Sequence, residues 1–223
     1  MKKFAIIVAG GSGTRMGTEI PKQFLELADK PILMHTIMQF HAYDENLKIT
    51  LVLPEFQFGY WKELCKKYEF DVPHQVVAGG DSRFQSVRNG LHSISEVKGV
   101  VFIHDGVRPL VSIATIEQCF EGALKTGNAL PVVHVVDSIR EVTTNGSWHK
   151  DRGNYRLVQT PQTFQLEKIK RAFLQEESPL FTDDASVLEA SGETINLVDG
   201  NAENIKITTP MDLQIADLLL RRR

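Results

Sequence analysis

Five short runs of apolar, largely branched residues recur in the first 133 positions of the chain, and each has the length of one strand. They cover residues 4–9, 49–53, 75–78, 100–104 and 129–133. The runs lack the regular polar alternation of a half-exposed strand, so both faces of each strand are expected to be buried. This pattern predicts a sheet that is covered on both sides.

Helical periodicity fills the gaps between these runs. Residues 31–43 carry apolar side chains at the four-then-three spacing of one helical face, and residues 81–94 begin with Asp81 or Ser82 as a helix cap. The apolar faces consist of Leu33, Ile37 and Phe40 in the first segment and of Phe84, Val87 and Leu91 in the second. Strands that alternate with helices in this way predict a parallel α/β sheet.

The pattern changes after residue 133. Residues 134–157 are rich in β-forming residues and contain Thr144, Asn145 and Gly146, and Asn-Gly is a strong signal for a hairpin turn. We therefore predict an arm that protrudes from a single domain of residues 1–223. The chain is then expected to return through helices at 166–175 and 182–192, a strand pair at 194–198 and 204–208, and a helix that begins at Pro210.

Composition and charge disfavour several classes of partner. The 223 residues include 25 Lys and Arg against 28 Asp and Glu, a formal net charge of -3 at pH 7, without a basic stripe to attract nucleic acid. The sequence has no run of 18 apolar residues to cross a membrane, and the run at 4–9 is too short for a secretory signal. Cys65 and Cys119 provide no disulfide framework. We therefore expect a cytoplasmic protein with no membrane or nucleic-acid partner.

A glycine cluster directly follows the first predicted strand, in FAIIVAGGSGTRMGTEIPKQF, residues 4–24. The spacing does not fit a dinucleotide fingerprint, because the next glycine after Gly13 is Gly17, and the Gly-Lys pair of a Walker loop is absent. Glycines at the end of a buried strand still let backbone N–H groups approach an anion, and Arg15 and Lys22 add positive charge. The alternative is an ordinary strand-to-helix turn with two solvated cations.

Polar and charged side chains also follow the other predicted strands. They are Asp81, Ser82, Arg83 and Ser86 after the third run and Asp105 and Arg108 after the fourth. Ligands of parallel α/β sheets bind beyond the carboxyl ends of the strands, so we expect these side chains to share a site with the glycine loop. The competing interpretations are helix capping by Asp81 or Ser82 and a surface ion pair between Asp105 and Arg108.

Seven motifs, in order and across nearly the whole chain, resemble those of the 2-C-methyl-D-erythritol 4-phosphate cytidylyltransferases. The motifs are AGGSGTRMG, PKQF, GGDSRFQSVRNGL, HDGVRP, QTPQTF, TDDAS and NIKIT. The resemblance implies a mostly parallel, Rossmann-like nucleotidyltransferase sheet with helices on both faces and a protruding β-arm. It also implies transfer of CMP from CTP to the methylerythritol phosphate, release of pyrophosphate, a requirement for Mg²⁺ and a place in isoprenoid synthesis.

The resemblance also implies roles for individual residues. Arg15 and Lys22 would stabilise the transition state, while Arg152 and Lys206 would hold the attacking phosphate. Nucleotide binding falls to Ala9, Gly10, Gly11, Gly13, Gly80, Asp81 and Ser86. Sugar-phosphate binding falls to Asp105, Arg108, Ser138, Arg152, Thr182 and Lys206, with Asp105 as the candidate carboxylate for Mg²⁺. In the family the arm crosses to a second subunit, so we expect a homodimer in which each arm completes the neighbour's site.

Several alternatives stay open at the level of the sequence. Ribitol 5-phosphate cytidylyltransferase shares the glycine loop, PKQF and a motif related to HDGVRP, and a nucleotide-binding regulatory module without turnover would keep the same fold. Thr160, Gln162 and residues 182–184 fit either contacts with sugar hydroxyl groups or turn and capping chemistry. His104 is interpreted as a hydrogen-bonded core residue rather than as a catalytic base.

Overall fold

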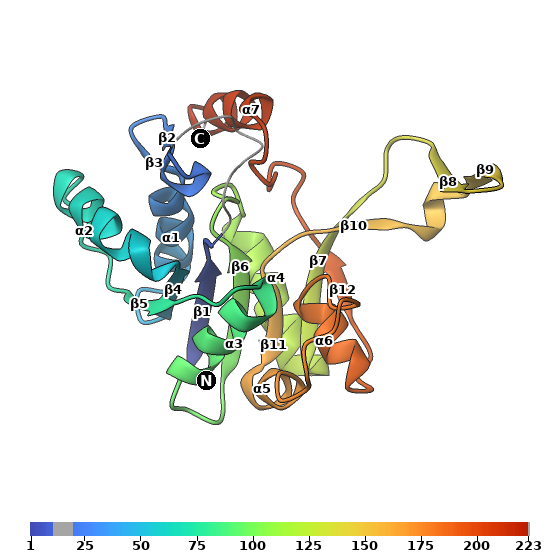
Figure 1. The fold of residues 1–223 in the computed structure, drawn as a ribbon, viewed down its shortest axis with the longest axis horizontal. Helices are drawn as coiled ribbons and strands as arrows, with labels where there is room; N and C mark the ends of the chain where they lie inside the picture. The colour runs from blue at the N-terminus through green and yellow to red at the C-terminus, as the bar shows by residue number, and fades with distance from the viewer. Residues whose placement is uncertain (11–19, 223) are drawn as a thin grey trace.

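A central sheet with strand order β10-β7-β11-β6-β1-β4-β5, to which β12 is added beside β7, forms the centre of the molecule (Figure 1). The computed structural model describes residues 1–10 and 20–222. The strands are β1 Lys3–Val8, β4 Lys48–Leu53, β5 Gln75–Ala78, β6 Val100–Asp105, β7 Asn128–His134, β10 Arg156–Val158, β11 Gln162–Gln165 and β12 Leu197–Asp199. All five predicted strands therefore form, with each bound within about one residue of the expected position.

The middle of the sheet is parallel. β1 pairs in parallel with β4 and β6, and β5 extends the same arrangement beyond β4. β11, which the hydrophobic pattern did not predict, runs antiparallel to both β6 and β7. The predicted α/β class with a mostly parallel sheet is confirmed, and the carboxyl ends of β1, β4, β5 and β6 lie at one edge of the sheet.

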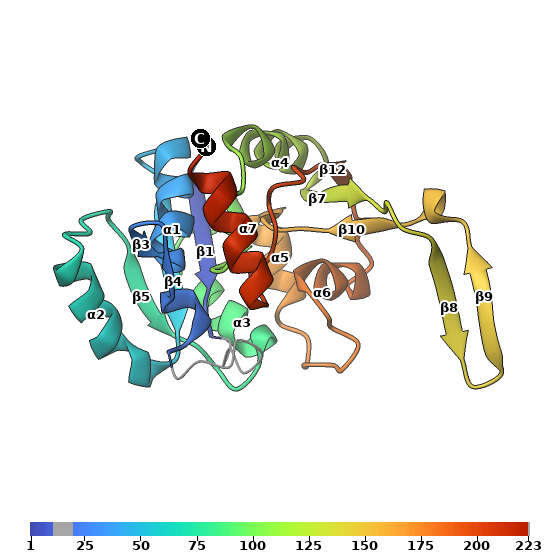
Figure 2. The same ribbon diagram turned by 90° about the horizontal axis from the view of Figure 1, so that it is seen from above.

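Helices cover both faces of this sheet (Figures 1 and 2). The helices of the described residues are α1 Ile32–Tyr43, α2 Phe58–Lys67, α3 Arg83–Ser93, α4 Ile113–Thr126, α5 Leu166–Ala172, α6 Asp184–Ala190 and α7 Pro210–Leu220. Of these, α7 packs in a separate small cluster with Leu27 and Val107. Alternate residues of β1 show the two layers, because Ala5 and Ile7 pack in the core with α1 and α4, whereas Phe4 and Ile6 pack with α3, α5 and α6. The runs in β1, β4, β6 and β7 are thus largely buried, as predicted. The prediction is wrong for residues 75–78, because β5 lies at the edge of the sheet and its side chains are exposed or only partly buried.

Capping chemistry determines where the helices begin. Ser82 Oγ accepts a hydrogen bond from the Gln85 N–H at 3.0 Å, so Ser82 rather than Asp81 caps α3. Pro210 is the first residue of α7, as predicted. Pro31 was expected at the first position of α1 but precedes that helix, because its backbone is extended and pairs within a short ladder of β2 (Glu26–Leu27) and β3 (Lys30–Pro31).

The predicted strand pair near the C-terminus is wrong. β12 pairs in parallel with β7, and residues 204–208 form no strand. The backbone of this segment instead contacts the turn after β6, since the Ile207 N–H donates to Val107 O at 3.0 Å and Arg108 Nη1 donates to Asn204 O at 2.7 Å. Contacts with that turn, rather than with a neighbouring strand, therefore provide hydrogen-bond partners for the backbone of this segment.

The predicted arm is present. β8 (Ile139–Thr143) and β9 (Gly146–Lys150) form an antiparallel hairpin that extends away from the rest of the molecule in both views (Figures 1 and 2). Gly146 has a φ of 133°, a conformation that favours glycine, so the Asn-Gly signal correctly located the turn. A 3-10 turn at Arg152–Asn154 then leads into β10.

Two further predictions concern the cysteines and the membrane. Cys119 is buried and Cys65 is partly buried, and both are free thiols. None of the helices in residues 1–10 and 20–222 combines the length and the apolar character needed to cross a membrane.

Candidate active site

A cavity of about 250 Å³ opens at the carboxyl edge of the parallel strands. Its walls come from the end of β1, the loop between β5 and α3, the turn after β6 and the segment that carries Lys206. The structure brings ten of the predicted site residues together in these walls, namely Ala9, Gly10, Lys22, Gly80, Asp81, Ser82, Arg83, Ser86, Asp105 and Lys206.

The other predicted residues do not line this cavity or fall outside the described part of the chain. Gly11, Gly13 and Arg15 belong to residues 11–19, which the structure does not describe. Ser138 and Arg152 are exposed in the arm, where Arg152 Nη1 donates to Val136 O. Arg108 lies close behind the cavity wall, with its side chain directed to Asp105 and to Asn204 O.

The loop between β5 and α3 forms one wall of the cavity. The Gly80 N–H donates to Ser86 Oγ at 3.1 Å, and the Asp81 N–H donates to Gln85 Oε1 at 3.1 Å. A Cβ atom on Gly80 would lie 2.4 Å from Gln85 Cβ, so this close approach of loop and helix requires glycine. The wall therefore carries no side chain at Gly80, which leaves room there for a flat group such as a base.

Gln23 supports the wall at the end of β1. Its side chain is buried, and Nε2 donates to Ala9 O at 2.9 Å and to Gln57 Oε1 at 3.0 Å. The same 3-10 turn, Lys22–Phe24, places Lys22 at the cavity. Sequence analysis assigned no role to Gln23, although its position in the PKQF motif beside Lys22 was the available signal.

Asp105 is a buried carboxylate among cations. Its Oδ2 accepts from Arg108 Nε at 3.2 Å and lies 3.0 Å from Lys206 Nζ. Burial opposes ionisation, but the charges of Lys206, Arg83 and Arg108 outweigh it and hold the pKa of Asp105 well below its usual value. Asp105 is therefore charged at neutral pH and orients Lys206. The ion pair with Arg108, proposed as an alternative to a site role, coexists with a place in the cavity wall.

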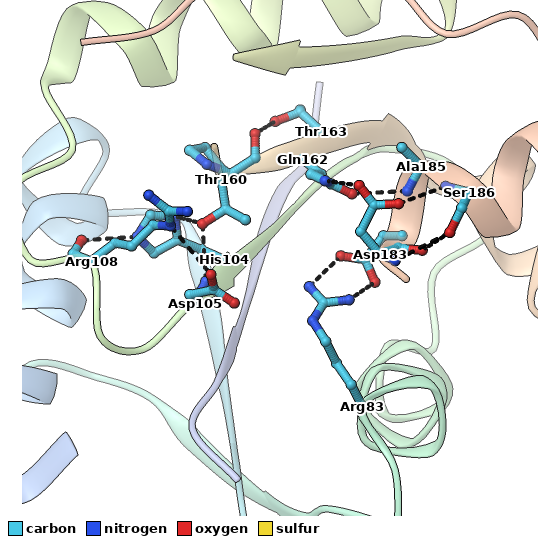
Figure 3. A network of polar contacts seen from close by, with 12 residues as sticks. Arg83, His104, Asp105, Arg108, Thr160, Gln162, Thr163, Asp183, Ala185 and Ser186 are labelled. Carbon is cyan, nitrogen blue, oxygen red and sulfur yellow. Dashed lines mark hydrogen bonds and ion pairs between the residues drawn. The ribbon is translucent and has the colours of Figure 1, made fainter. Parts of the chain in front are cut away.

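His104 and Thr160 hold the turn that follows β6 (Figure 3). His104 is fully buried, with Nε2 3.0 Å from Arg108 O and Nδ1 3.0 Å from Thr160 Oγ1. Thr160 Oγ1 also accepts from the Asp105 N–H at 3.1 Å. Burial lowers the pKa of His104 to about 4, so the imidazole is neutral near pH 7. The prediction of a hydrogen-bonded core histidine is confirmed.

Arg83 connects the start of α3 to the start of α6 (Figure 3). Its Nη1 and Nη2 donate to the two carboxylate oxygens of Asp184 at 2.7 and 2.6 Å. Gln162 Nε2 donates to Asp183 Oδ2 at 2.7 Å, and Asp183 caps α6. Capping chemistry therefore accounts for Asp183, while Thr182 is exposed and does not line the cavity. Arg83 does line it, as expected for a polar side chain that follows the third predicted strand, although no individual role was assigned to it.

The residues that line the cavity fit a metal ion whose ligands come mainly from the phosphate oxygens of the substrate. Among the described residues, no three His, Cys, Asp or Glu side chains are grouped to hold a metal ion. Both contacts of Asp105 with described cations use Oδ2, so Oδ1 could serve as one metal ligand. Mg²⁺ keeps several waters and relies on substrate phosphates, and a single carboxylate beside a phosphate site is consistent with that preference.

This arrangement defines a class of protein. Parallel strands end at a cavity that is lined by Gly10 and Gly80 and by the cations Lys22 and Lys206, as expected for an α/β nucleotidyltransferase. The profile of the family described as 2-C-methyl-D-erythritol 4-phosphate cytidylyltransferase matches residues 4–222. The chain belongs to this family.

Relatives and solved structures agree with that assignment. The chain is 52% identical over 220 residues to the 2-C-methyl-D-erythritol 4-phosphate cytidylyltransferase of Bacteroides fragilis, covering 99% of this chain and 100% of that protein. It is 51% identical over 221 residues to that of Porphyromonas gingivalis, covering 98% of both. The crystal structure of the enzyme from Thermus thermophilus superposes with a TM-score of 0.80 at 28% identity, covering 99% of this chain and 100% of that one. The 4-diphosphocytidyl-2C-methyl-D-erythritol synthase of Anaerococcus prevotii gives 0.83 at 26% identity, covering 99% of both chains.

Proposed function

We propose that this chain transfers CMP from CTP to 2-C-methyl-D-erythritol 4-phosphate. The reaction releases pyrophosphate and forms 4-diphosphocytidyl-2-C-methyl-D-erythritol, an isoprenoid precursor. The observation that carries the proposal is the meeting of Lys22, Asp105 and Lys206 in a cavity with a glycine-lined wall. Family membership supplies the identity of the two substrates. Ribitol 5-phosphate and a module without turnover are disfavoured, because the relatives are named for the methylerythritol phosphate and Lys22 and Lys206 both line the cavity.

The nucleotide occupies the backbone-lined side of the cavity. Ala9 and Gly10 at the end of β1 and Gly80, Asp81 and Ser86 around the start of α3 surround the cytosine and its ribose. Backbone N–H and carbonyl groups distinguish bases by their hydrogen-bonding edge, and a narrow wall excludes the larger purines. The contact between the Gly80 N–H and Ser86 Oγ keeps this wall in place before CTP binds.

The transfer is a displacement at the α-phosphorus of CTP. An oxygen of the sugar phosphate attacks that phosphorus, a new P–O bond forms, and the bond to the bridging oxygen breaks as pyrophosphate leaves with the electron pair. The attacking phosphate is already ionised near neutral pH, so the step needs no general base. His104 is buried and both of its ring nitrogens form hydrogen bonds, so it is not placed to act as a base, in agreement with a step that needs none. Lys22 and Lys206 stabilise the negative charge that gathers around the phosphorus.

Asp105 would hold Mg²⁺ together with substrate oxygens and water. The metal, when bound, neutralises part of the triphosphate charge. The protein itself contributes a fixed, ionised carboxylate, since the pKa of Asp105 is held low by its cationic neighbours.

The arm completes the site of a second copy in a symmetric homodimer. Ser138 and Arg152 stand in the arm rather than at the cavity of their own chain. The arm and the strand that follows it also expose large apolar side chains, namely Val136, Val142, Trp148, Tyr155, Leu157 and Val158. A partner subunit that covers these side chains explains both features. The chain is thus one domain of residues 1–223 with an exchanged arm at 134–157, and it acts in the cytoplasm, where CTP is available.

Product identification tests this function. Purified protein with CTP, Mg²⁺ and 2-C-methyl-D-erythritol 4-phosphate should yield one new compound with the mass of the cytidyl diphosphate ester, in equal amount to pyrophosphate. Pyrophosphate without that ester would indicate hydrolysis of CTP and would contradict the proposed transfer.

A further inference from the structure

Arg83 is a third cation in the wall of the cavity, beside Lys22 and Lys206. A guanidinium group has five N–H donors arranged around a plane. Asp184 accepts one hydrogen bond from Nη1 and one from Nη2, which occupies the end of the plane. That pairing leaves the Nε–H and one further Nη N–H side by side on the adjacent edge. In the described part of the chain, Asp184 provides the only hydrogen-bond acceptors that Arg83 uses.

The ion pair with the buried Asp184 fixes the orientation of the Arg83 guanidinium group. Asp184 is 1% exposed, whereas the Arg83 side chain is 32% exposed and can be reached from solvent. The start of α6 is itself held in place, because Gln162 accepts from the Ala185 N–H at 2.8 Å and donates to Asp183. A substrate that contacts Arg83 therefore meets a side chain whose rotational entropy is already lost.

The chemistry of the remaining edge selects an anion with two oxygens. Two parallel N–H groups match phosphate and carboxylate oxygens in a bidentate arrangement. The carboxylates in the described cavity wall belong to Asp81 and Asp105, and Asp105 is already paired with Lys206 and Arg108. A bound phosphate group is therefore the natural partner for the second edge of Arg83.

We propose that Arg83 binds a substrate phosphate through this second edge and that Asp184 is the residue that positions it. The inference rests on the proposed function for the identity of the ligands, which are the triphosphate of CTP and the phosphate of the acceptor polyol. Both phosphates offer the same chemistry to a guanidinium group. The test distinguishes them by measuring nucleotide and acceptor binding separately.

The test compares phosphate-bearing and phosphate-free ligands in matched variants. Arg83→Gln alone would leave Asp184 buried without a partner, so the main variant is the pair Arg83→Gln with Asp184→Asn, in which two neutral amides replace the ion pair. Titration calorimetry of the Mg²⁺-containing protein with CTP, pyrophosphate and cytidine measures the nucleotide side. Steady-state KM for 2-C-methyl-D-erythritol 4-phosphate measures the acceptor side. Melting temperature confirms that each variant is folded.

We expect the paired variant to lose about 10- to 100-fold in affinity or KM for one phosphate-bearing ligand, as for a charge-assisted hydrogen bond, while cytidine binds unchanged. Weaker CTP and pyrophosphate binding assigns the triphosphate, and a raised KM for the acceptor alone assigns the sugar phosphate. Arg83→Lys should recover part of the loss, because it restores the charge but not the two-donor edge. Unchanged values for every phosphate ligand, or an equal loss for cytidine, would overturn the proposal.

The proposed function fails in a different way. Wild-type protein that binds CTP but forms no cytidylyl ester would contradict the reaction, whereas the comparison of CTP with cytidine in the variants would still decide whether Arg83 contacts a phosphate.

Discussion

Lys206 Nζ lies 3.0 Å from Asp105 Oδ2, so a cation near the C-terminus is oriented by a carboxylate at the end of a central strand. The Lys206 side chain is 43% exposed, while that of Asp105 is 11% exposed, which leaves the ammonium group accessible and its partner enclosed. The hydrogen bond from the Ile207 N–H to Val107 O holds the two segments together. A residue of the irregular C-terminal segment thereby becomes part of a cavity built at the strand ends.

Removal of either cavity lysine, Lys22 or Lys206, should impair the chemical step. We predict that Lys22→Ala and Lys206→Ala each lower turnover about a hundredfold, or ~3 kcal/mol, because each removes fixed positive charge from the transition state. The measurement is kcat for pyrophosphate release at saturating substrates.

A matched lysine provides the control for that prediction. Lys168 is paired with Glu193 at 2.7 Å on the surface and lies outside the cavity, so Lys168→Ala should keep normal turnover. Cavity variants that remain folded and turn over at the wild-type rate would refute the role of these cations.

Exchange of the arm predicts complementation between two inactive variants. If each site combines Lys22 of one subunit with Arg152 of the other, a mixed dimer of Lys22→Ala and Arg152→Ala chains has one intact site. An equal mixture with full subunit exchange should then recover about a quarter of the wild-type activity. Mass spectrometry of differently labelled chains verifies the exchange. Mixed dimers that stay inactive would show that both residues act within one chain.

The buried imidazole of His104 predicts a pH dependence of stability. In the unfolded chain this group takes up a proton near pH 6.5, whereas its pKa in the folded protein is about 4. The unfolded state therefore binds more protons between these values, and stability should fall as the pH falls through that window. Denaturant unfolding from pH 7 to pH 4 should show a steeper loss for the wild type than for His104→Gln. Parallel profiles would mean that His104 is protonated in the folded protein.

Asp105 should determine the Mg²⁺ concentration that the enzyme needs for activity. We predict that Asp105→Asn raises the half-saturating Mg²⁺ concentration roughly tenfold or more, since the amide removes the charge that attracts the ion. Asp81→Asn serves as the comparison, because it neutralises the other carboxylate of the described cavity wall. An equal shift in both variants would indicate a general effect of charge rather than a metal contact at Asp105.

Local patterns in the sequence were sufficient for most of the fold. Four of the five branched apolar runs became strands buried between two helical layers, and β1 shows this with Ile6 and Ile7 on opposite sides. The fifth, β5, formed a partly exposed strand at the edge of the sheet. Asn145 and Gly146 located the arm, and the cap of α3 was limited to Asp81 or Ser82, of which the structure shows Ser82. Hydrophobic runs, turn signals and helix caps each depend on a few neighbouring residues, so they can be recognised directly in the sequence.

Contacts between distant segments could not be predicted in the same way. The segment 204–208 alternates like a strand, yet its backbone is satisfied by the turn after β6, so its partner lies about a hundred positions away. The pairing of Arg83 with Asp184 and the bonds of Gln23 to Ala9 and Gln57 have the same origin. Nothing in the local sequence specifies such partners, although Arg83, Asp184 and Gln23 each lie in a motif quoted for the family resemblance.

The most direct test of the account is pyrophosphate release with CTP and Mg²⁺, with 2-C-methyl-D-erythritol 4-phosphate and ribitol 5-phosphate offered in parallel. The account predicts a kcat/KM for the methylerythritol phosphate that exceeds the value for ribitol 5-phosphate by at least about a hundredfold, the discrimination that a built polar site can provide. Equal use of the two acceptors, or preference for ribitol 5-phosphate, would contradict the proposed substrate. Absence of release with either would contradict the proposed enzyme.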